Sequence, residues 1–379
     1  MALEFVFWGS LFLGFYPYLV YPLLAFLMAL AIRRPAAVVA GNPPKVSVLI
    51  SAYNEQSCIE ATVKNKLDSA YNGDLEVLIA SDGSDDGTDA ILERLSLEDQ
   101  RIQFWRQEPR SGKTAALNYL SGIAKGEILV LADANSIYRK DTISLLVENF
   151  SDPKVGYVTG KMVYRSRDKN LVGEGTSAFI RYENSLREFE SKLGSVVGVN
   201  GGVDAVRASL YEVIRPDLQS DFYLPLSVVA QRFRVIYDPR AIVEEEALVA
   251  PASEFKMRVR VAQRALWVLQ EKRSLLFGAA GACYAWQLWS HKVLRYLSGI
   301  PFVLALVTGI ALSMESAVYA CLMSIYIVCL LLAITGHFGI KFAPARYAYY
   351  FLRLNIASTV ALIAYLRGQK KTLWKPRGG

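Results

Sequence analysis

Short apolar runs alternate with amphipathic stretches in the part of the chain that follows residue 45. Four runs are rich in β-branched residues and have the length of strands, at residues 46–51, 75–80, 102–105 and 128–132. Helix-like patterning lies between them, at residues 57–69, 88–96 and 113–124. This alternation implies right-handed crossovers and parallel strands. We therefore predict an α/β fold, a mostly parallel sheet with flanking helices.

A longer apolar run precedes this pattern. Residues 5–32 carry no charge, which is ample for a helix that crosses roughly 30 Å of hydrocarbon. A signal peptide would carry positive charge before a shorter apolar core, whereas here Glu4 precedes the run and Arg33 and Arg34 follow it. The positive-inside rule places the chain after Arg34 in the cytosol. Residues 1–34 are predicted to form a transmembrane anchor, kinked at its prolines, with a linker at residues 36–44.

Membrane patterns return in the last third of the chain. A basic amphipathic stretch at residues 254–273 predicts interfacial helices over residues 253–292. Residues 296–314 and 316–340 are uncharged and long enough to span, and only Glu315 separates them. The last apolar run, residues 354–366, is short and predicts an interfacial or re-entrant segment, with a tilted span from about Ala343 as the alternative. The number of spans in residues 293–379 stays open.

The charge and the cysteine content limit which binding partners and which compartment we expect. The chain is 53% hydrophobic and 20% charged, with a formal net charge of +7. Because the basic residues lie beside apolar runs, they favour a lipid bilayer over nucleic acid as the partner. The four cysteines show no ligand spacing, which fits a reducing cytosol and makes a zinc site unexpected. We expect a multi-pass protein of the inner (plasma) membrane with a cytosolic catalytic domain.

Polar side chains follow the predicted strands where ligands collect in open α/β sheets. Asp133 and Asn135 follow the fourth strand, and Asp133 offers the hard oxygens that suit Mg²⁺ or Mn²⁺. The alternative is a strand that ends in a polar turn. The polar residues that follow the other strands decide between a metal site and a polar turn.

Two acidic loops follow the first and second strands, at residues 52–55 and 81–88. They suit hydrogen bonds to a base and a ribose, although the second also suits a tight turn capped by Asp86 or Thr88. Residues 111–114, Ser-Gly-Lys-Thr, match the end of a P-loop, but Gln107 stands where the first glycine is required. We exclude a Walker A site. Lys113 at a helix start can still meet a diphosphate.

These motifs in this order resemble the family 2 glycosyltransferases with the A-type nucleotide-sugar fold, over residues 45–270. The resemblance implies donor contacts from loop one, loop two and the following helix, made by Ala52, Tyr53, Glu55, Asp82 and Lys113. Asp133 and Asn135 stand at the family's Asp-x-Asp metal motif. Asn135 departs from the commonest form, so the metal prediction rests on Asp133.

The second half of this region, residues 151–252, is predicted to hold the acceptor, and residues 45–150 the nucleotide-sugar. Paired Gly201 and Gly202 allow backbone to approach a ligand, with a tight turn as the alternative. Inverting transfer needs a base for the acceptor hydroxyl. Asp221 matches the position of the family's catalytic acidic residue, although Ser220 replaces the first of the usual pair. The alternative for Asp221 is a helix cap.

Residues 263–267 resemble the Gln-x-x-Arg-Trp motif of processive members such as the cellulose, chitin and hyaluronan synthases. Gln263 and Trp267 match, but Leu266 stands where the motif has arginine. We expect Trp267 to stack on an acceptor sugar, and Arg260 or Arg264 to face the diphosphate. A plain interfacial helix explains the same residues, so processive synthesis stays open.

The predicted function is inverting, metal-dependent sugar transfer from a nucleotide-sugar, expected to be a UDP-sugar, in polysaccharide synthesis. The acceptor is expected to be a membrane-associated glycan or lipid. Single-sugar transfer to polyprenyl phosphate and a non-catalytic nucleotide sensor are the alternatives. A transporter is disfavoured because no charged residue lies mid-span.

Overall fold

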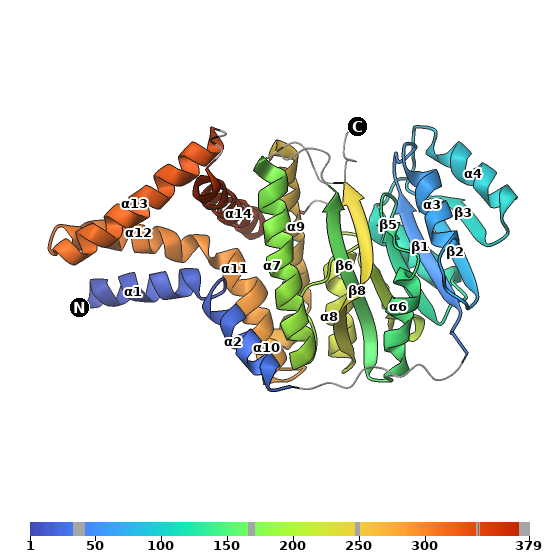
Figure 1. Ribbon diagram of the computed structural model, residues 1–379, viewed down its shortest axis with the longest axis horizontal. Helices are drawn as coiled ribbons and strands as arrows, with labels where there is room; N and C mark the ends of the chain where they lie inside the picture. The colour runs from blue at the N-terminus through green and yellow to red at the C-terminus, as the bar shows by residue number, and fades with distance from the viewer. Residues whose placement is uncertain (33–41, 166–170, 247–250, 339, 341, 371–379) are drawn as a thin grey trace.

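An eight-stranded sheet organises the middle of the chain (Figure 1). The computed structural model describes residues 1–32, 42–165, 171–246, 251–338, 340 and 342–370. The sheet has the order β3-β2-β1-β4-β7-β6-β8-β5. Its strands are β1 (Val46–Ala52), β2 (Leu75–Ser81), β3 (Ile102–Arg106), β4 (Ile128–Asp133), β5 (Ile137–Tyr138), β6 (Val155–Arg165), β7 (Asp204–Arg207) and β8 (Arg234–Glu246). All four predicted strands are present, and the predicted α/β class is confirmed.

The sheet is parallel in its first half and mixed in its second. Strands β3, β2, β1 and β4 are mutually parallel. The helices that connect them are α3 (Ile59–Leu67), α4 (Thr88–Glu98) and α5 (Lys113–Ile123). Strand β7 is antiparallel to both β4 and β6, and β5 is antiparallel to β8. The parallel half therefore directs the carboxyl ends of β1, β2 and β4 to one edge.

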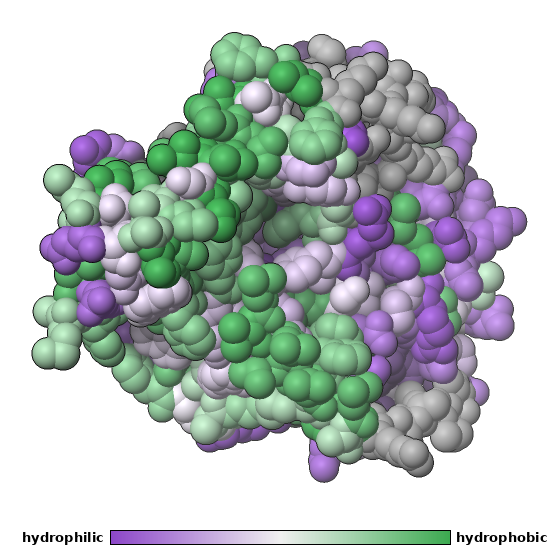
Figure 2. Space-filling view, turned by 60° about the vertical axis from the view of Figure 1, so that its left-hand side comes forward, coloured by the Kyte–Doolittle hydropathy of each residue, from purple (hydrophilic) through white to green (hydrophobic). Residues whose placement is uncertain are grey.

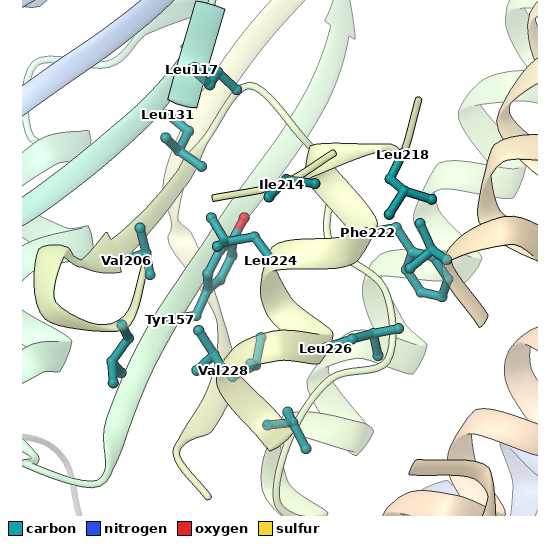
Figure 3. Packing of buried hydrophobic residues seen from close by; sticks show 14 of the residues in the cluster. Leu117, Leu131, Tyr157, Val206, Ile214, Leu218, Phe222, Leu224, Leu226 and Val228 are labelled. Atoms are coloured by element: carbon teal, nitrogen blue, oxygen red, sulfur yellow. The ribbon is translucent and has the colours of Figure 1, made fainter. Parts of the chain in front are cut away.

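Helices cover both faces of the sheet. Helices α3, α4 and α6 (Thr142–Glu148) bury apolar side chains against one face. Helices α5 and α8 (Ser220–Ala230) do so against the other. Figure 3 shows Leu224 and Val228 of α8 packed around Tyr157 of β6, with Val206 and Leu131 on the neighbouring strands. Burial of these side chains fixes α8, and with it the acidic residue near its start.

Helices from the two ends of the chain gather at the end of the molecule away from β1–β3 (Figure 1). They are α1 (Ala2–Phe15), α2 (Val20–Leu30), α10 (Ala282–Leu288), α11 (Leu294–Leu297), α12 (Gly299–Ser313), α13 (Ala317–His337) and α14 (Ala343–Leu366). A π-helical turn, Trp289–Val293, joins α10 to α11. In this end, α1 packs against α12 and α13 against α14. Figure 2 shows apolar side chains massed over it, and a hollow beside the polar remainder.

Two of these helices, α13 and α14, are each long and apolar enough to cross a membrane. Two bent pairs, α1 with α2 and the stretch 282–297 with α12, would raise the number to four if each is one span. The predicted N-terminal helix is broken after Phe15, near Pro17, by a 54° bend. Helix α14 starts at Ala343, so the tilted span agrees with the structure better than a short segment at 354–366. Arg33, Arg34 and residues 36–41 of the linker lie outside the described residues.

A polar node joins the two bends. Tyr18 lies in the break between α1 and α2, and Ser298 lies between α11 and α12. The Tyr18 hydroxyl is 3.1 Å from Ser298 Oγ, which donates to Asn355 Oδ1 of α14 at 2.6 Å. Three helical segments far apart in sequence are thus fixed to one another at the same point.

A buried ionic cluster attaches these helices to helix α7 (Leu171–Leu193), which packs beside β8 and α2. His291 Nδ1 lies 2.6 Å from Glu190, and His291 Nε2 lies 3.1 Å from Glu183. Arg295 donates to Glu183, and Tyr21 donates to Glu190 at 2.5 Å. Burial raises the pKa of Glu183, but the positive charge of Arg295 outweighs burial and holds that pKa well below its usual range. The cluster therefore ties the terminal helices to the sheet domain by paired, buried charge.

Replacing Glu183 with glutamine should weaken this attachment. Arg295 would keep its buried charge and lose its carboxylate, a loss of about 3 kcal/mol by the usual size of a broken buried pair. We expect Glu183→Gln to lower the melting temperature in detergent by roughly 5 °C or more. The matched control is Glu188→Gln on the same helix, whose exposed pair with Lys192 should be worth no more than about 1 kcal/mol. Equal shifts for the two variants would contradict this role of the cluster.

Candidate active site

The loops after β1 and β2 hold each other at the carboxyl edge of the sheet. Asn54 has a φ of 54°, its Nδ2 donates to Asp85 Oδ1 at 2.5 Å, and its Oδ1 accepts from the Asp85 N–H at 3.0 Å. The backbone N–H of Glu55 donates to Thr88 Oγ1 at 2.9 Å. These reciprocal bonds make a rigid rim that carries Tyr53 and Glu55, two of the predicted donor residues. Their contact with a nucleoside stays a prediction.

Asp82 organises the loop that leads into α5. Its carboxylate, in a residue only 2% exposed, accepts from the backbone N–H groups of Ser111 at 2.8 Å and Gly112 at 3.0 Å. Gln107 Nε2 donates to it at 2.6 Å. The Asp82 carboxylate is thus engaged with its own chain here, and its predicted contact with a nucleoside is untested. By fixing the backbone at Gly112, the Asp82 carboxylate positions the next residue, Lys113.

Arg110 of the same loop stacks on Tyr53, and the sequence analysis did not single it out. Its guanidinium is 3.4 Å from the centroid of the Tyr53 ring, a cation–π distance. Arg110 Nε also lies 3.3 Å from Asp82. The only signal in the sequence was its position just before the Ser-Gly-Lys-Thr motif.

Lys113 brings together the two aspartates that the sequence singled out. Its Nζ donates to Asp133 Oδ1 at 2.6 Å and to Asp221 Oδ1 at 3.2 Å. The three residues come from the start of α5, the end of β4 and the start of α8. Burial lowers the pKa of Lys113, but attraction from Asp133 and Asp221 outweighs it and raises that pKa above its ordinary value. The cluster therefore holds one cation between two carboxylates.

Asp221 does not cap α8. The N-cap of that helix is Gln219, and no side chain makes a capping hydrogen bond there. The helix-cap alternative is therefore wrong, and the carboxylate of Asp221 is directed at Lys113. A base that removes a proton needs access to its substrate, and the Asp221 side chain is 26% exposed.

The paired glycines lie against both aspartates. Gly201 and Gly202 have φ of +69° and +70°, which glycine adopts without strain. A Cβ on Gly201 would lie 3.3 Å from Asp221 Oδ2, and one on Gly202 would lie 3.1 Å from Asp133 Oδ2 and 3.2 Å from Glu245 Oε1. The Tyr138 hydroxyl donates to the Gly202 carbonyl at 2.7 Å. The backbone conformation therefore favours glycine at both positions, and a side chain at either would also crowd a carboxylate of the site.

The oxygen donors around Gly202 fit a divalent cation. The carboxylates of Asp133 and Glu245 both approach the space that a Cβ on Gly202 would fill. Glu245 was missed, and its signal was the acidic triplet at residues 244–246. In the parts of the chain that the structure describes, no three His, Cys, Asp or Glu residues form a metal-binding group. A cation here would take further ligands from a bound molecule. Ligation by Asn135, two residues beyond Asp133, stays a prediction.

Lys66 supplies positive charge behind this site. It is fully buried, and its Nζ donates to the Ser136 carbonyl at 2.6 Å and lies over the Tyr138 ring. Burial lowers the pKa of Lys66 to about 7, and the charges of Asp133 and Glu245 oppose that fall. Nothing in its helical sequence context indicated this position.

Asp204 is a second buried acid of the site that the sequence did not single out. It lies on β7 opposite Leu131 of β4 and is 1% exposed. Burial and the charge of Asp221 raise the pKa of Asp204 to about 7, although Lys113 and the hydroxyls of Thr159 and Tyr157 oppose the rise. Asp204 is therefore about half protonated at neutral pH and largely protonated below it.

The predicted acceptor residues Gln263, Arg264 and Trp267 lie on α9 (Pro251–Glu271), and the end of the described chain covers two of them. Gln263 Nε2 and Trp267 Nε1 both donate to the Gln369 carbonyl, at 2.7 and 3.2 Å. Arg264 donates to the Leu218 carbonyl at 2.5 Å, just before α8. These side chains hold the C-terminal segment and the start of α8, and their contact with an acceptor stays a prediction.

Helix α9 is more than an interfacial helix. Ala265, Val268 and Leu269 pack into the core that lies under α8, and α9 also packs against α14. It therefore connects the sheet domain to the last apolar helix.

An aspartate at the end of β4 and an aspartate at the start of α8 converge on Lys113, at the carboxyl edge of the parallel strands of an α/β sheet. This is the construction of glycosyltransferases with the A-type fold. Comparison with protein families agrees, because residues 47–213 match the model described as Glycosyl transferase family 2. Residues 47–213 thus carry a family 2 glycosyltransferase domain, the family that the sequence motifs resemble.

Several known proteins resemble the chain. Beta-monoglucosyldiacylglycerol synthase of Nostoc sp. is 30% identical over 238 residues, which are 60% of this chain and 51% of that protein. Glycosyltransferase AglD of Haloferax volcanii is 30% identical over 55% of this chain and 34% of its own length. The chain thus spans about half the length of these relatives or less. The structure of mannosyltransferase PcManGT of Pyrobaculum calidifontis has a TM-score of 0.75 at 24% identity, covers 97% of this chain and is itself covered to 99%. That likeness confirms the fold over both the sheet domain and the apolar helices.

An alanine at Gly202 should disturb the site more than backbone strain alone. Both Gly202→Ala and Gly278→Ala place a Cβ at positive φ, at a cost of about 1–2 kcal/mol. Only at Gly202 does the Cβ also meet the two carboxylates, since nothing lies within 4 Å at Gly278. We expect Gly202→Ala to lower the melting temperature more than the Gly278→Ala control does. Equal decreases in melting temperature for the two variants would show that a Cβ at Gly202 fits beside the two carboxylates.

Asp204 should make stability fall as the pH rises. Its folded pKa of about 7 exceeds the ordinary value of 3.8, so its contribution is fully present below pH about 4 and is lost as the pH rises through about 7. Between pH 5 and 8 we expect wild type to lose roughly 2 kcal/mol, or about 5 °C in melting temperature, relative to Asp204→Asn. The exposed Asp141→Asn control should follow wild type. Parallel melting curves for wild type and Asp204→Asn would exclude the titration of Asp204 in this range.

Proposed function

We propose that the chain is an inverting, metal-dependent glycosyltransferase that moves a sugar from a nucleotide-sugar to an acceptor at the membrane. The observation that carries this proposal is the contact of Lys113 with both Asp133 and Asp221. It joins the residue expected to hold the metal and donor to the residue expected to be the base. A structural turn would require neither the second carboxylate nor its placement on another element.

The divalent cation would be held by Asp133 and Glu245, with Asn135 as a further oxygen donor. When bound, it supplies positive charge that stabilises the leaving nucleoside diphosphate. Lys113 adds a second positive charge at the same end of the donor. Mn²⁺ and Mg²⁺ both suit these ligands, and the PcManGT structure is a complex with GDP-Man and Mn²⁺.

Lys113 also sets when Asp221 acts. In the free protein its ammonium neutralises Asp221, with 3.2 Å between Nζ and Oδ1. A donor diphosphate would draw this ammonium toward its own oxygens, which leaves Asp221 free to accept a proton. Asp221 then takes the proton of the acceptor hydroxyl as that oxygen attacks the anomeric carbon. Direct displacement by this oxygen inverts the configuration of the sugar.

The donor we propose is a UDP-sugar, bound by Ala52, Tyr53, Glu55 and the loop that Asp82 holds. The ring of Tyr53, already stacked by Arg110, offers a flat surface for the base. GDP-Man in PcManGT makes a guanine nucleotide the first competitor to test.

The acceptor we propose is a membrane-associated glycan or lipid, used in cell-surface polysaccharide synthesis. Up to four candidate spans lie beside the domain, which supports our proposal of a multi-pass protein of the inner membrane with a cytosolic active site. The Nostoc relative is named for a lipid product, which keeps single-sugar transfer to polyprenyl phosphate as the alternative. The presence of both Asp133 and Asp221 argues against a nucleotide sensor.

The test uses the full chain in lipid nanodiscs with a panel of nucleotide-sugars and Mn²⁺ or Mg²⁺, with release of nucleoside diphosphate as the readout. Loss of the base should reduce kcat about 100-fold or more in Asp221→Asn, with binding of nucleoside diphosphate unchanged. Asp99→Asn, a partly exposed acid paired with Arg101, is the control that should keep full activity. Excess chelator should abolish turnover until the metal is restored.

A separate result would contradict each component of the proposal. Full turnover by Asp221→Asn would contradict its assignment as the base, and full turnover in excess chelator would contradict the requirement for a metal. No release from any donor would favour the sensor. The size of the lipid-extracted product separates a polymer ladder from a single transferred sugar.

A further inference from the structure

Lys292 lies where the terminal helices meet the catalytic domain. It belongs to the π-helical turn Trp289–Val293, a type of helix that occurs often at functional sites. Its ammonium lies against Gly198, so closely that a Cβ on Gly198 would be 2.5 Å from Nζ. The same ammonium is 5.5 Å from the ring centroid of Phe222, the residue after Asp221. Lys292 therefore reaches from the apolar helices to the neighbourhood of the proposed base.

The charge of Lys292 has no direct partner among the residues that the structure describes. Glu183 and Glu190 lie within range of it, but their oxygens are bonded to Arg295, His291 and Tyr21. In the described chain, Lys292 forms no hydrogen bond and no ion pair. A half-buried ammonium without a bonded carboxylate is costly unless a ligand supplies the anion.

A second cation lies beside it. Arg187 of α7 donates through Nε to the Gly198 carbonyl at 2.8 Å and is close enough to Lys292 to repel its charge. Two cations thus lie beside Gly198. Their combined field favours a group with more than one negative charge, as a phosphate has.

We propose that Lys292, with Arg187, binds the phosphate of a lipid-linked acceptor. This inference rests on the proposed function and specifies its acceptor as a sugar joined to a membrane lipid through phosphate. The lipid would lie along the apolar helices, the phosphate at Lys292, and the sugar hydroxyl at Asp221. The buried Phe222 side chain connects the two positions in the chain, because it follows Asp221 and its ring centroid is 5.5 Å from the Lys292 ammonium.

Gly198 is part of the same site. With hydrogen in place of a side chain, it leaves room for the Lys292 ammonium. A methyl group at this position would push Lys292 away without changing any charge. Gly198→Ala therefore tests the position of Lys292 separately from its charge.

The binding experiment uses the full chain in nanodiscs of neutral lipid, with farnesyl phosphate and farnesol as the matched probes. We expect wild type to bind the phosphate about tenfold more tightly than the alcohol, the effect of one charged hydrogen bond. Lys292→Met and Gly198→Ala should remove this preference, and Lys292→Arg should retain most of it. Lys192→Met, which removes an exposed lysine of α7, is the control and should behave as wild type.

Competition identifies the source of the phosphate. Displacement of farnesyl phosphate by phosphatidylglycerol at equal concentration would make the site a general headgroup site and overturn the acceptor assignment. Displacement by inorganic phosphate alone would make it a free-phosphate site, with the same consequence. Failure of both to compete supports a site for the phosphate of an isoprenoid lipid.

Donor turnover in the same preparations separates the two proposals. Equal binding of farnesol and farnesyl phosphate, together with normal release of nucleoside diphosphate, would overturn the role of Lys292 and leave the proposed function standing. Selective binding of farnesyl phosphate without turnover of any donor would support the phosphate site and overturn the proposed function. Unchanged melting temperatures, with the recovery in Lys292→Arg, show that loss of binding in Lys292→Met is not loss of fold.

Discussion

The attraction of one lysine for two aspartates determines how the catalytic half of this protein is assembled. Lys113 draws the end of β4 and the start of α8 to the first turn of α5, although these positions are far apart in the sequence. Two carboxylates this close would repel each other without the cation between them. Much of the surrounding structure holds this arrangement in place, with Asp82 fixing the loop before Lys113 and the paired glycines leaving space for both acids.

The same attraction gives the site two electrostatic states. With the lysine centred between the acids, the free protein carries one net negative charge on these three groups. A donor brings its own negative charges, and these are compatible with the cluster only if further positive charge enters with them. Lys66 behind the site supplies part of this positive charge when it is protonated, and the cation that Asp133 and Glu245 fit would supply the rest.

How far the sequence predicts this structure follows from the range of the interactions involved. Strands such as residues 128–132 and the acids at their ends are local patterns, so the fold class, Asp133 and Asp221 were predictable. Glu245, Arg110 and Lys66 were not, because each acquires its role from a strand or loop distant in the sequence. Gln263 and Trp267 were recognised by motif, yet the motif does not reveal that Gln369 occupies their donors. The start of α14 at Ala343 was an open alternative, because the charges at its ends obscure a helix that packing on α9 and α13 supports.

The node of Tyr18, Ser298 and Asn355 has a consequence for depth. It lies where both bent helix pairs change direction, so α1 and α12 leave on one side of it and α2 and α11 stay with the catalytic domain on the other. If α1 and α12 enter the hydrocarbon, this polar point marks the level of the bilayer surface. The distance from that surface to Asp221 is then set by the rigid connection through α7 and its ionic cluster. The enzyme would then select acceptors by the distance between their reactive hydroxyl and the membrane surface, in addition to any recognition of the sugar itself.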